Sequence, residues 1–94
     1  MTIRQTFQTA ISTSNLSVRE KFQLRLAMLL PGPRSKIEEA LTQALQEEGL
    51  VPAEAAFDTA SDAPGMQALN WDAIAKFIQT MLPIILQIIA LFPK

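Results

Sequence analysis

The side chains that could do chemistry in this sequence are carboxylates and cations, because it contains no histidine, cysteine or tyrosine. Histidine and cysteine supply most nucleophile–base pairs in enzymes. The adjacent acid pairs Glu38–Glu39 and Glu47–Glu48 are the remaining candidates for acid–base work or metal binding. Neighbouring residues on a helix point in different directions, so these pairs are typical of a solvated surface. We expect no catalytic residue, no metal ligand, no cofactor and no enzymatic activity.

The two signs of charge occupy different parts of the chain. Residues 1–36 carry six basic side chains and one acid, a balance of +5, whereas residues 37–72 carry eight acids and no base. Such a chain can fold back on itself or stack head-to-tail with a copy, through attractions that salt weakens. A cluster of cations could also bind phosphates, but Glu20 interrupts this one, and we expect a solvated face and no nucleic-acid partner. The cluster consists of Arg19, Lys21, Arg25, Arg34 and Lys36.

The elements that position these groups are predicted to be helices within one small all-α domain, since 94 residues suffice for a modest core. Residues 2–14 place four apolar side chains at helical spacing, which predicts a short amphipathic helix. Ser17 and Glu20 have the spacing of a capping box and predict a second helix that runs to about Leu30. The apolar stripe of the first helix is Ile3, Phe7, Ala10 and Ile11.

In the second helix one apolar face is expected, widened by Leu24 and Met28, and Pro31-Gly32-Pro33 should end the helix. The main residues of that face are Val18, Phe22, Leu26, Leu29 and Leu30.

Ser35 and Glu38 repeat the capping-box spacing and predict the start of a third helix, with a stripe of Ile37, Leu41, Ala44 and Leu45. Gly49 should take the left-handed position after this helix, with Leu50 against Leu45. These elements give an N-terminal three-helix region over residues 1–50. Residues 51–69 are rich in Ala, Asp and Pro and are expected to form a linker that Phe57 pins to the helices.

The C-terminal stretch, residues 70–94, dominates the sequence. Asn70 is a plausible N-cap for a long hydrophobic helix over residues 71–92, whose apolar arc covers about 260°. Pro83 lies on its narrow polar stripe and predicts a kink, because the carbonyl of Gln79 loses its helical partner. The helix should be longer than the three short helices can cover, so that an overhang of Ile85, Ile88, Ile89 and Phe92 would stay exposed.

The interpretation that follows is a non-enzymatic structural or assembly protein, in which this helix mediates self-association as a homo-oligomer or docking to a protein partner. A small viral or phage structural component would fit such a module. The expected interface residues are Trp71, Ile74, Ile78, Leu82, Ile85, Ile89 and Phe92.

The alternative is a small membrane-associated protein that residues 71–92 anchor or make membrane-active. No charge occurs from Phe77 to Pro93, a run of about 26 Å as a helix, slightly short of the roughly 30 Å hydrocarbon layer. The N-terminus contains no apolar segment typical of a secretory signal, so we expect an intracellular protein, in solution, at a membrane or within a larger assembly.

Overall fold

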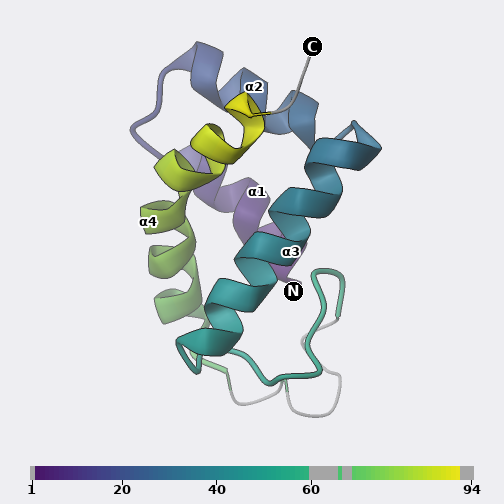
Figure 1. Ribbon diagram of the computed structural model, residues 1–94. Helices are drawn as coiled ribbons and strands as arrows, with labels where there is room; N and C mark the ends of the chain where they lie inside the picture. The colour runs from purple at the N-terminus through teal and green to yellow at the C-terminus, as the bar shows by residue number, and fades with distance from the viewer. Residues whose placement is uncertain (1, 60–65, 67–68, 92–94) are drawn as a thin grey trace.

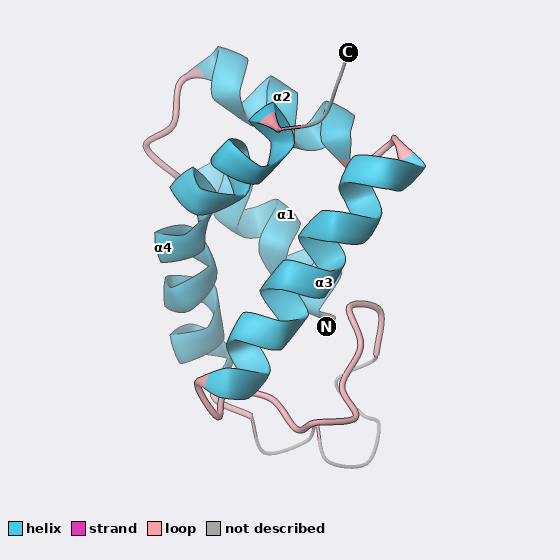
Figure 2. Ribbon diagram, viewed as in Figure 1, coloured by secondary structure: helices cyan, strands magenta, loops and turns pink. Residues whose placement is uncertain are grey.

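The computed structural model of the chain describes residues 2–59, 66 and 69–91, and within them it contains four helices and no strand (Figures 1 and 2). The all-α class and the long hydrophobic C-terminal helix are confirmed. The helices are α1 (Ile3–Thr13), α2 (Val18–Ala27), α3 (Pro31–Glu47) and α4 (Trp71–Ala90).

Helix α4 is the centre of the packing, since it contacts each of the other three helices. One stripe of α4 is completely buried, and it meets the buried stripe of α1 and three buried residues of α3. Burying a side chain of this size contributes about 1.5–3 kcal/mol, so α4 is first of all the core helix of its own domain. The three stripes are Ile74, Ile78, Leu82 and Ile85; Ile3, Phe7, Ala10 and Ile11; and Ile37, Leu41 and Leu45.

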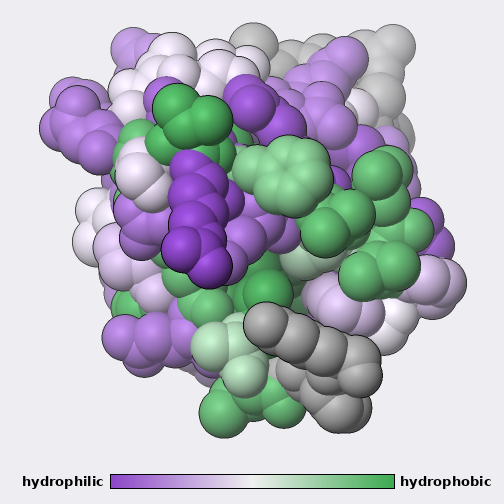
Figure 3. All heavy atoms as spheres, turned by 90° about the horizontal axis from the view of Figure 1, so that it is seen from above, coloured by the Kyte–Doolittle hydropathy of each residue, from purple (hydrophilic) through white to green (hydrophobic). Residues whose placement is uncertain are grey.

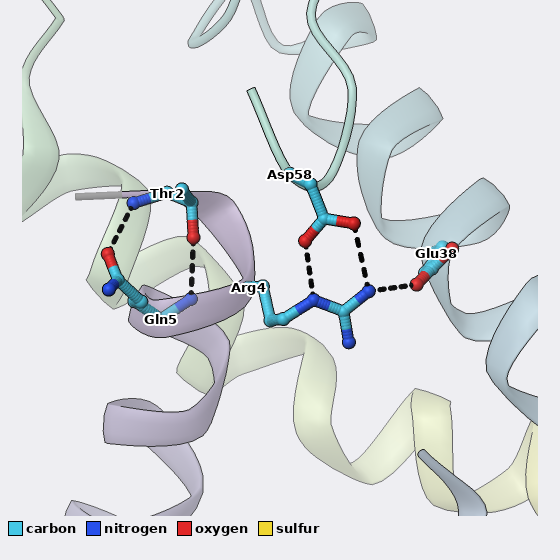
Figure 4. Close-up of polar contacts among 5 residues, drawn as sticks. All are labelled: Thr2, Arg4, Gln5, Glu38 and Asp58. Carbon is cyan, nitrogen blue, oxygen red and sulfur yellow. Dashed lines mark hydrogen bonds and ion pairs between the residues drawn. The ribbon is translucent and has the colours of Figure 1, made fainter. Parts of the chain in front are cut away.

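Side-chain caps fix where three of the helices begin. The expected capping box is present in α2, where Glu20 N–H donates to Ser17 Oγ and Ser17 N–H donates to Glu20 Oε1, both at 3.1 Å. Asn70 caps α4 by accepting from the backbone of Ala73 at 3.1 Å. Thr2 and Gln5 form a further capping box at the start of α1 (Figure 4).

The start of α3 differs from the prediction. The helix begins at Pro31 after an extended Leu30, not at a Ser35 cap, and Pro31 to Pro33 form its first turn. The first N–H groups of a helix have no intrahelical acceptor, and proline at the first position has no N–H to leave unpaired. The Pro-Gly-Pro segment therefore starts a helix in the same place where it prevents α2 from continuing.

The end of α3 follows the prediction. Gly49 has φ +72°, Leu50 N–H donates to Leu45 O at 3.0 Å, and Gly49 N–H donates to Gln46 O at 3.0 Å. These two bonds define a Schellman motif. Glycine at this position avoids the steric cost that a side chain pays in the left-handed region.

The chain after α3 packs against the helices in the part that the structure describes. Val51, Ala55 and Phe57 are buried, and the ring of Phe57 meets Phe7 edge-on at 5.9 Å between centroids. Pinning by Phe57 is thus confirmed. The backbone of this segment forms turns, and the segment adds to the core beside α1.

Candidate docking surface

The expected interface residues of α4 lie mainly inside the domain. Ile74, Ile78, Leu82 and Ile85 are completely buried, whereas Trp71 and Ile89 are half-buried, and Phe92 lies outside the described residues. A partner could reach the four buried positions only if the core opened, so their role in an interface stays a prediction.

The expected overhang of α4 must also be corrected. Ile85 is buried and Ile88 and Ile89 are half-buried, because α3 starts earlier than expected and α2 packs across the C-terminal half of α4. In Figure 1 the axis of α4 changes direction in its second half, where Pro83 lies with an exposed side chain. Among the described residues, the large hydrophobic side chains that remain exposed on this half or directly after it are Ile84 and Leu91.

Most of the exposed large apolar side chains in the part of the chain that the structure describes belong instead to α2 and the turn that follows it. Val18 is 86% exposed and Phe22 is 62% exposed, although both are large and apolar. Helical spacing places them on one apolar face, and in the structure this face points to water. The full set on this segment is Val18, Phe22, Leu26, Leu29 and Leu30.

Helix α2 is apolar on two opposite sides. At about 100° per residue, Val18, Phe22 and Leu26 fall within about 80° of one another. The residues that enter the core from this segment are Leu24, Ala27 and Met28, and they centre about 180° away from the exposed stripe. The expectation that Leu24 and Met28 widen the face of Val18 and Phe22 is therefore wrong. Leu24 and Met28 form a second face, which packs α2 against the rest of the domain.

This exposed stripe lies at one end of the molecule. Helix α2 runs across the end where α3 begins and α4 finishes (Figure 1). Figure 3, a view onto that end, shows hydrophobic side chains gathered beside hydrophilic ones. We call this region the end surface and define it by its exposed apolar residues: Val18, Phe22, Leu26, Leu29, Leu30 and Leu91.

Cations border the end surface. Arg19 and Arg25 are exposed and fall on opposite sides of the α2 stripe by helical spacing. Arg25 Nη2 donates to Ser12 Oγ at 3.0 Å and Lys21 Nζ donates to Ser12 O at 3.2 Å, so both side chains contact the end of α1. Arg34, in the first turn of α3, adds charge at the same end.

Acids gather at the opposite end of the long axis of the molecule. Glu47 and Glu48 are exposed at the end of α3, and Asp72 is exposed in the first turn of α4. Figure 1 shows that these helix ends lie away from α2. The asymmetry of charge along the sequence therefore becomes an asymmetry in space, with the basic end carrying the exposed apolar stripe.

A charged cluster joins the two halves of the sequence away from the end surface (Figure 4). Arg4 donates to both carboxylate oxygens of Asp58 and, at 2.6 Å, to Glu38, while its guanidinium carbon lies 5.2 Å from the Phe57 ring centroid. The hydrogen bond from Arg4 lowers the pKa of Asp58, and the same bond raises the pKa of Arg4. Since Arg4 ties α1 to α3 and to the following segment, this cluster holds the fold together.

A groove of about 740 Å³ lies between α1 and α4. Its walls are mainly amide and hydroxyl side chains, with Trp71 and Asp72 at the α4 side. Among the described residues, no group of three or more His, Cys, Asp or Glu side chains could hold a metal ion. The groove thus offers hydrogen bonds and one carboxylate, and it contains no pair of groups arranged for proton transfer.

Comparison of the chain with protein-family models, curated proteins and solved structures found no match. Its function is therefore argued from the chemistry of its own surfaces.

Proposed function

We propose that this chain is a non-enzymatic docking protein, and that the end surface is where it docks. The observation that carries the proposal is the exposure of five large apolar side chains on α2 and the turn that follows it, while other residues of the same segment supply its contacts with the core. The side chains of Val18 and Leu29 in particular, 86% and 75% exposed, contribute little to the core. Several large apolar side chains that face water on one short segment are typical of a site that another molecule covers.

In this proposal α4 acts mainly as the core helix. Its buried stripe holds α1 and α3 together, and its contribution to docking is limited to its C-terminal end, where Leu91 is exposed. The proposal thus keeps the assembly role that the sequence indicates, but it assigns this role to the end surface and not to the buried stripe of α4. The core stays closed while the protein binds, which a docking role for Ile78 or Leu82 would not allow.

Helix α4 also meets the length and composition of a membrane span, since it has 20 residues and few charges. Its completely buried stripe argues against that role for the folded domain. Removing α4 from the bundle would expose Phe7 and Leu41 to water, at a cost of roughly 1.5–3 kcal/mol for each side chain. We therefore favour docking of the intact fold.

The test compares Phe22→Asp with Gln23→Asp. Both positions are exposed neighbours on α2, and both substitutions add one negative charge, but only Phe22 lies on the apolar stripe. Circular dichroism and thermal melting first establish that both variants fold. Sedimentation velocity then measures self-association, vesicle flotation measures lipid binding, and cross-linking in an extract with mass spectrometry measures protein partners.

The expected result is that Phe22→Asp loses whichever association the wild-type chain shows, because an unpaired carboxylate would be buried in the contact. Gln23→Asp should retain most of it. Equal behaviour of the two variants, or a wild-type chain that associates with nothing in the three assays, would refute the docking role of the end surface.

A further inference from the structure

The binding partner of the end surface must match two properties at once. It has to cover an apolar stripe that runs along α2, and it has to tolerate positive charge on both sides of that stripe, from Arg19 and Arg25. The first two turns of α3, which begins at the same end, add Arg34 and Lys36, both exposed.

A second copy of this chain does not provide both properties. Two-fold pairing of the α2 stripes would bring Arg19 and Arg25 close to the same residues of the copy, and like charges at an interface repel. Head-to-tail stacking would satisfy the charges by placing Glu47 and Glu48 against the basic end. Among the residues that the structure describes, however, the acidic end carries no exposed large apolar side chain to cover the stripe.

We infer that the end surface binds the face of an anionic lipid bilayer, with α2 lying in the plane of the interface. An in-plane helix buries its apolar face at the boundary between headgroups and acyl chains, while its cations contact anionic headgroups. The helix fits this role because it lies across one end of the molecule (Figure 1), and the face seen at that end shows hydrophobic side chains beside hydrophilic ones (Figure 3). This inference rests on the proposed docking function and names its partner.

When α2 binds the bilayer surface in this way, α4 stays inside the bundle. This binding mode therefore differs from one in which α4 inserts across the bilayer. Trp71, the sole tryptophan, stands at the start of α4, whereas the end surface lies at the finish of that helix. Twenty helical residues extend about 30 Å. A bilayer that contacts α2 therefore stays away from Trp71, whereas insertion of α4 would bring Trp71 into the lipid interface.

The experiment uses the full chain and two kinds of vesicle, phosphatidylcholine alone and phosphatidylcholine mixed with phosphatidylglycerol. We expect flotation with the anionic vesicles that weakens as salt is added. Phe22→Ser should weaken partitioning at least about ten-fold, since a buried phenylalanine side chain is lost. Gln23→Ser, its uncharged neighbour control, should change it little.

A second variant pair tests the charge. Arg19→Gln should weaken partitioning about five-fold, the typical contribution of one cation near an anionic membrane. Lys76→Gln removes a cation of α4 far from the end surface and should have almost no effect. Equal losses in the two variants would mean that net charge, and not the end surface, governs the binding.

Tryptophan emission tests which end of the protein contacts the bilayer. Phe22→Trp in a Trp71→Phe background should shift to the blue with anionic vesicles, while Trp71 emission in the wild-type chain should stay unchanged. A blue shift of Trp71 emission in the wild-type chain would contradict binding through α2 and would indicate that α4 inserts into the bilayer. A chain that ignores anionic vesicles but loses self-association or protein cross-links in Phe22→Asp would overturn the lipid inference and leave the docking function standing.

Discussion

Arg4 and Asp58 lie 54 residues apart in the sequence and form a bidentate ion pair, with Nε to Oδ1 at 2.5 Å and Nη2 to Oδ2 at 3.1 Å. The backbone supports the same contact, since Arg4 N–H donates to Phe57 O at 3.0 Å. One cation of the basic half, Arg4, therefore pairs with two acids of the acidic half, Glu38 and Asp58. The pair also fastens the segment after α3 to the first turn of α1.

Replacing Arg4 should destabilise the fold moderately. Arg4→Gln removes the cation shared by Asp58 and Glu38 and the contact with the Phe57 ring. We expect a loss of about 1–2 kcal/mol in the free energy of unfolding, because the pair is largely exposed and solvent screens it. Arg19→Gln, at an exposed position of α2, is the control and should stay within about 0.5 kcal/mol. Urea unfolding measures both, and equal losses would contradict the assigned role.

The ion pair should also make stability depend on pH. The hydrogen bond from Arg4 lowers the pKa of Asp58 in the folded chain, so the unfolded chain binds the proton more readily. The stabilisation is complete above the unfolded pKa of about 4 and disappears as pH falls through the lower folded value. Wild type and Asp58→Asn should differ by less than about 1 kcal/mol near neutrality and converge in acid. If the difference in stability between wild type and Asp58→Asn persisted at low pH, it would not come from the ion pair with Arg4.

Truncation of two isoleucines of α4 should destabilise the fold to very different extents. Ile78 is completely buried and Ile84 is 46% exposed. Ile78→Ala should cost about 2–5 kcal/mol through lost burial and a residual cavity. Ile84→Ala should cost less than about 1 kcal/mol, since alanine also favours the helix. Thermal melting of both variants checks this, and the assignment of the buried stripe would be wrong if Ile84→Ala were the more damaging change.

Substitution of Gly49 should measure how much free energy of unfolding depends on the backbone conformation at this position. A Cβ added there meets nothing within 4 Å, so the penalty of Gly49→Ala comes from φ +72° alone. We expect about 1–2 kcal/mol. Gly49→Asn should cost less, because asparagine enters the left-handed region more readily. If alanine and asparagine were equally tolerated in chemical denaturation, the Schellman end of α3 would not be set by conformation.

Local patterns were sufficient to predict much of the fold. The stripe of α1, the Ser17 capping box, the Asn70 cap and the Gly49 end all follow from interactions within a few residues. The length and hydrophobicity of α4 likewise made it the centre of the bundle. Short-range hydrogen bonding and helical spacing decide these features, and both are encoded next to the residues concerned.

The orientation of α2 could not be predicted in the same way. Its stronger stripe, with Val18 and Phe22, points to water, and its weaker side, with Leu24 and Ala27, enters the core. Helical spacing alone separates these two sides, which was an available sign that α2 has two apolar faces. The choice between them depends on α1 and α4, which pack beside α2. The early start of α3 depends on Pro31, since proline suits the first position of a helix as well as preventing the continuation of the one before it.

The central place of α4 has a consequence for biosynthesis. Helices α1, α2 and α3 precede it in the chain, yet the buried side chains of α1 and α3 have α4 as their main partner. During translation these three helices leave the ribosome before the helix that completes their core. Isolated short helices are only marginally stable in water, so the nascent chain gains its fold only when α4 emerges, and until then the apolar stripes of α1 and α3 lack the helix that buries them.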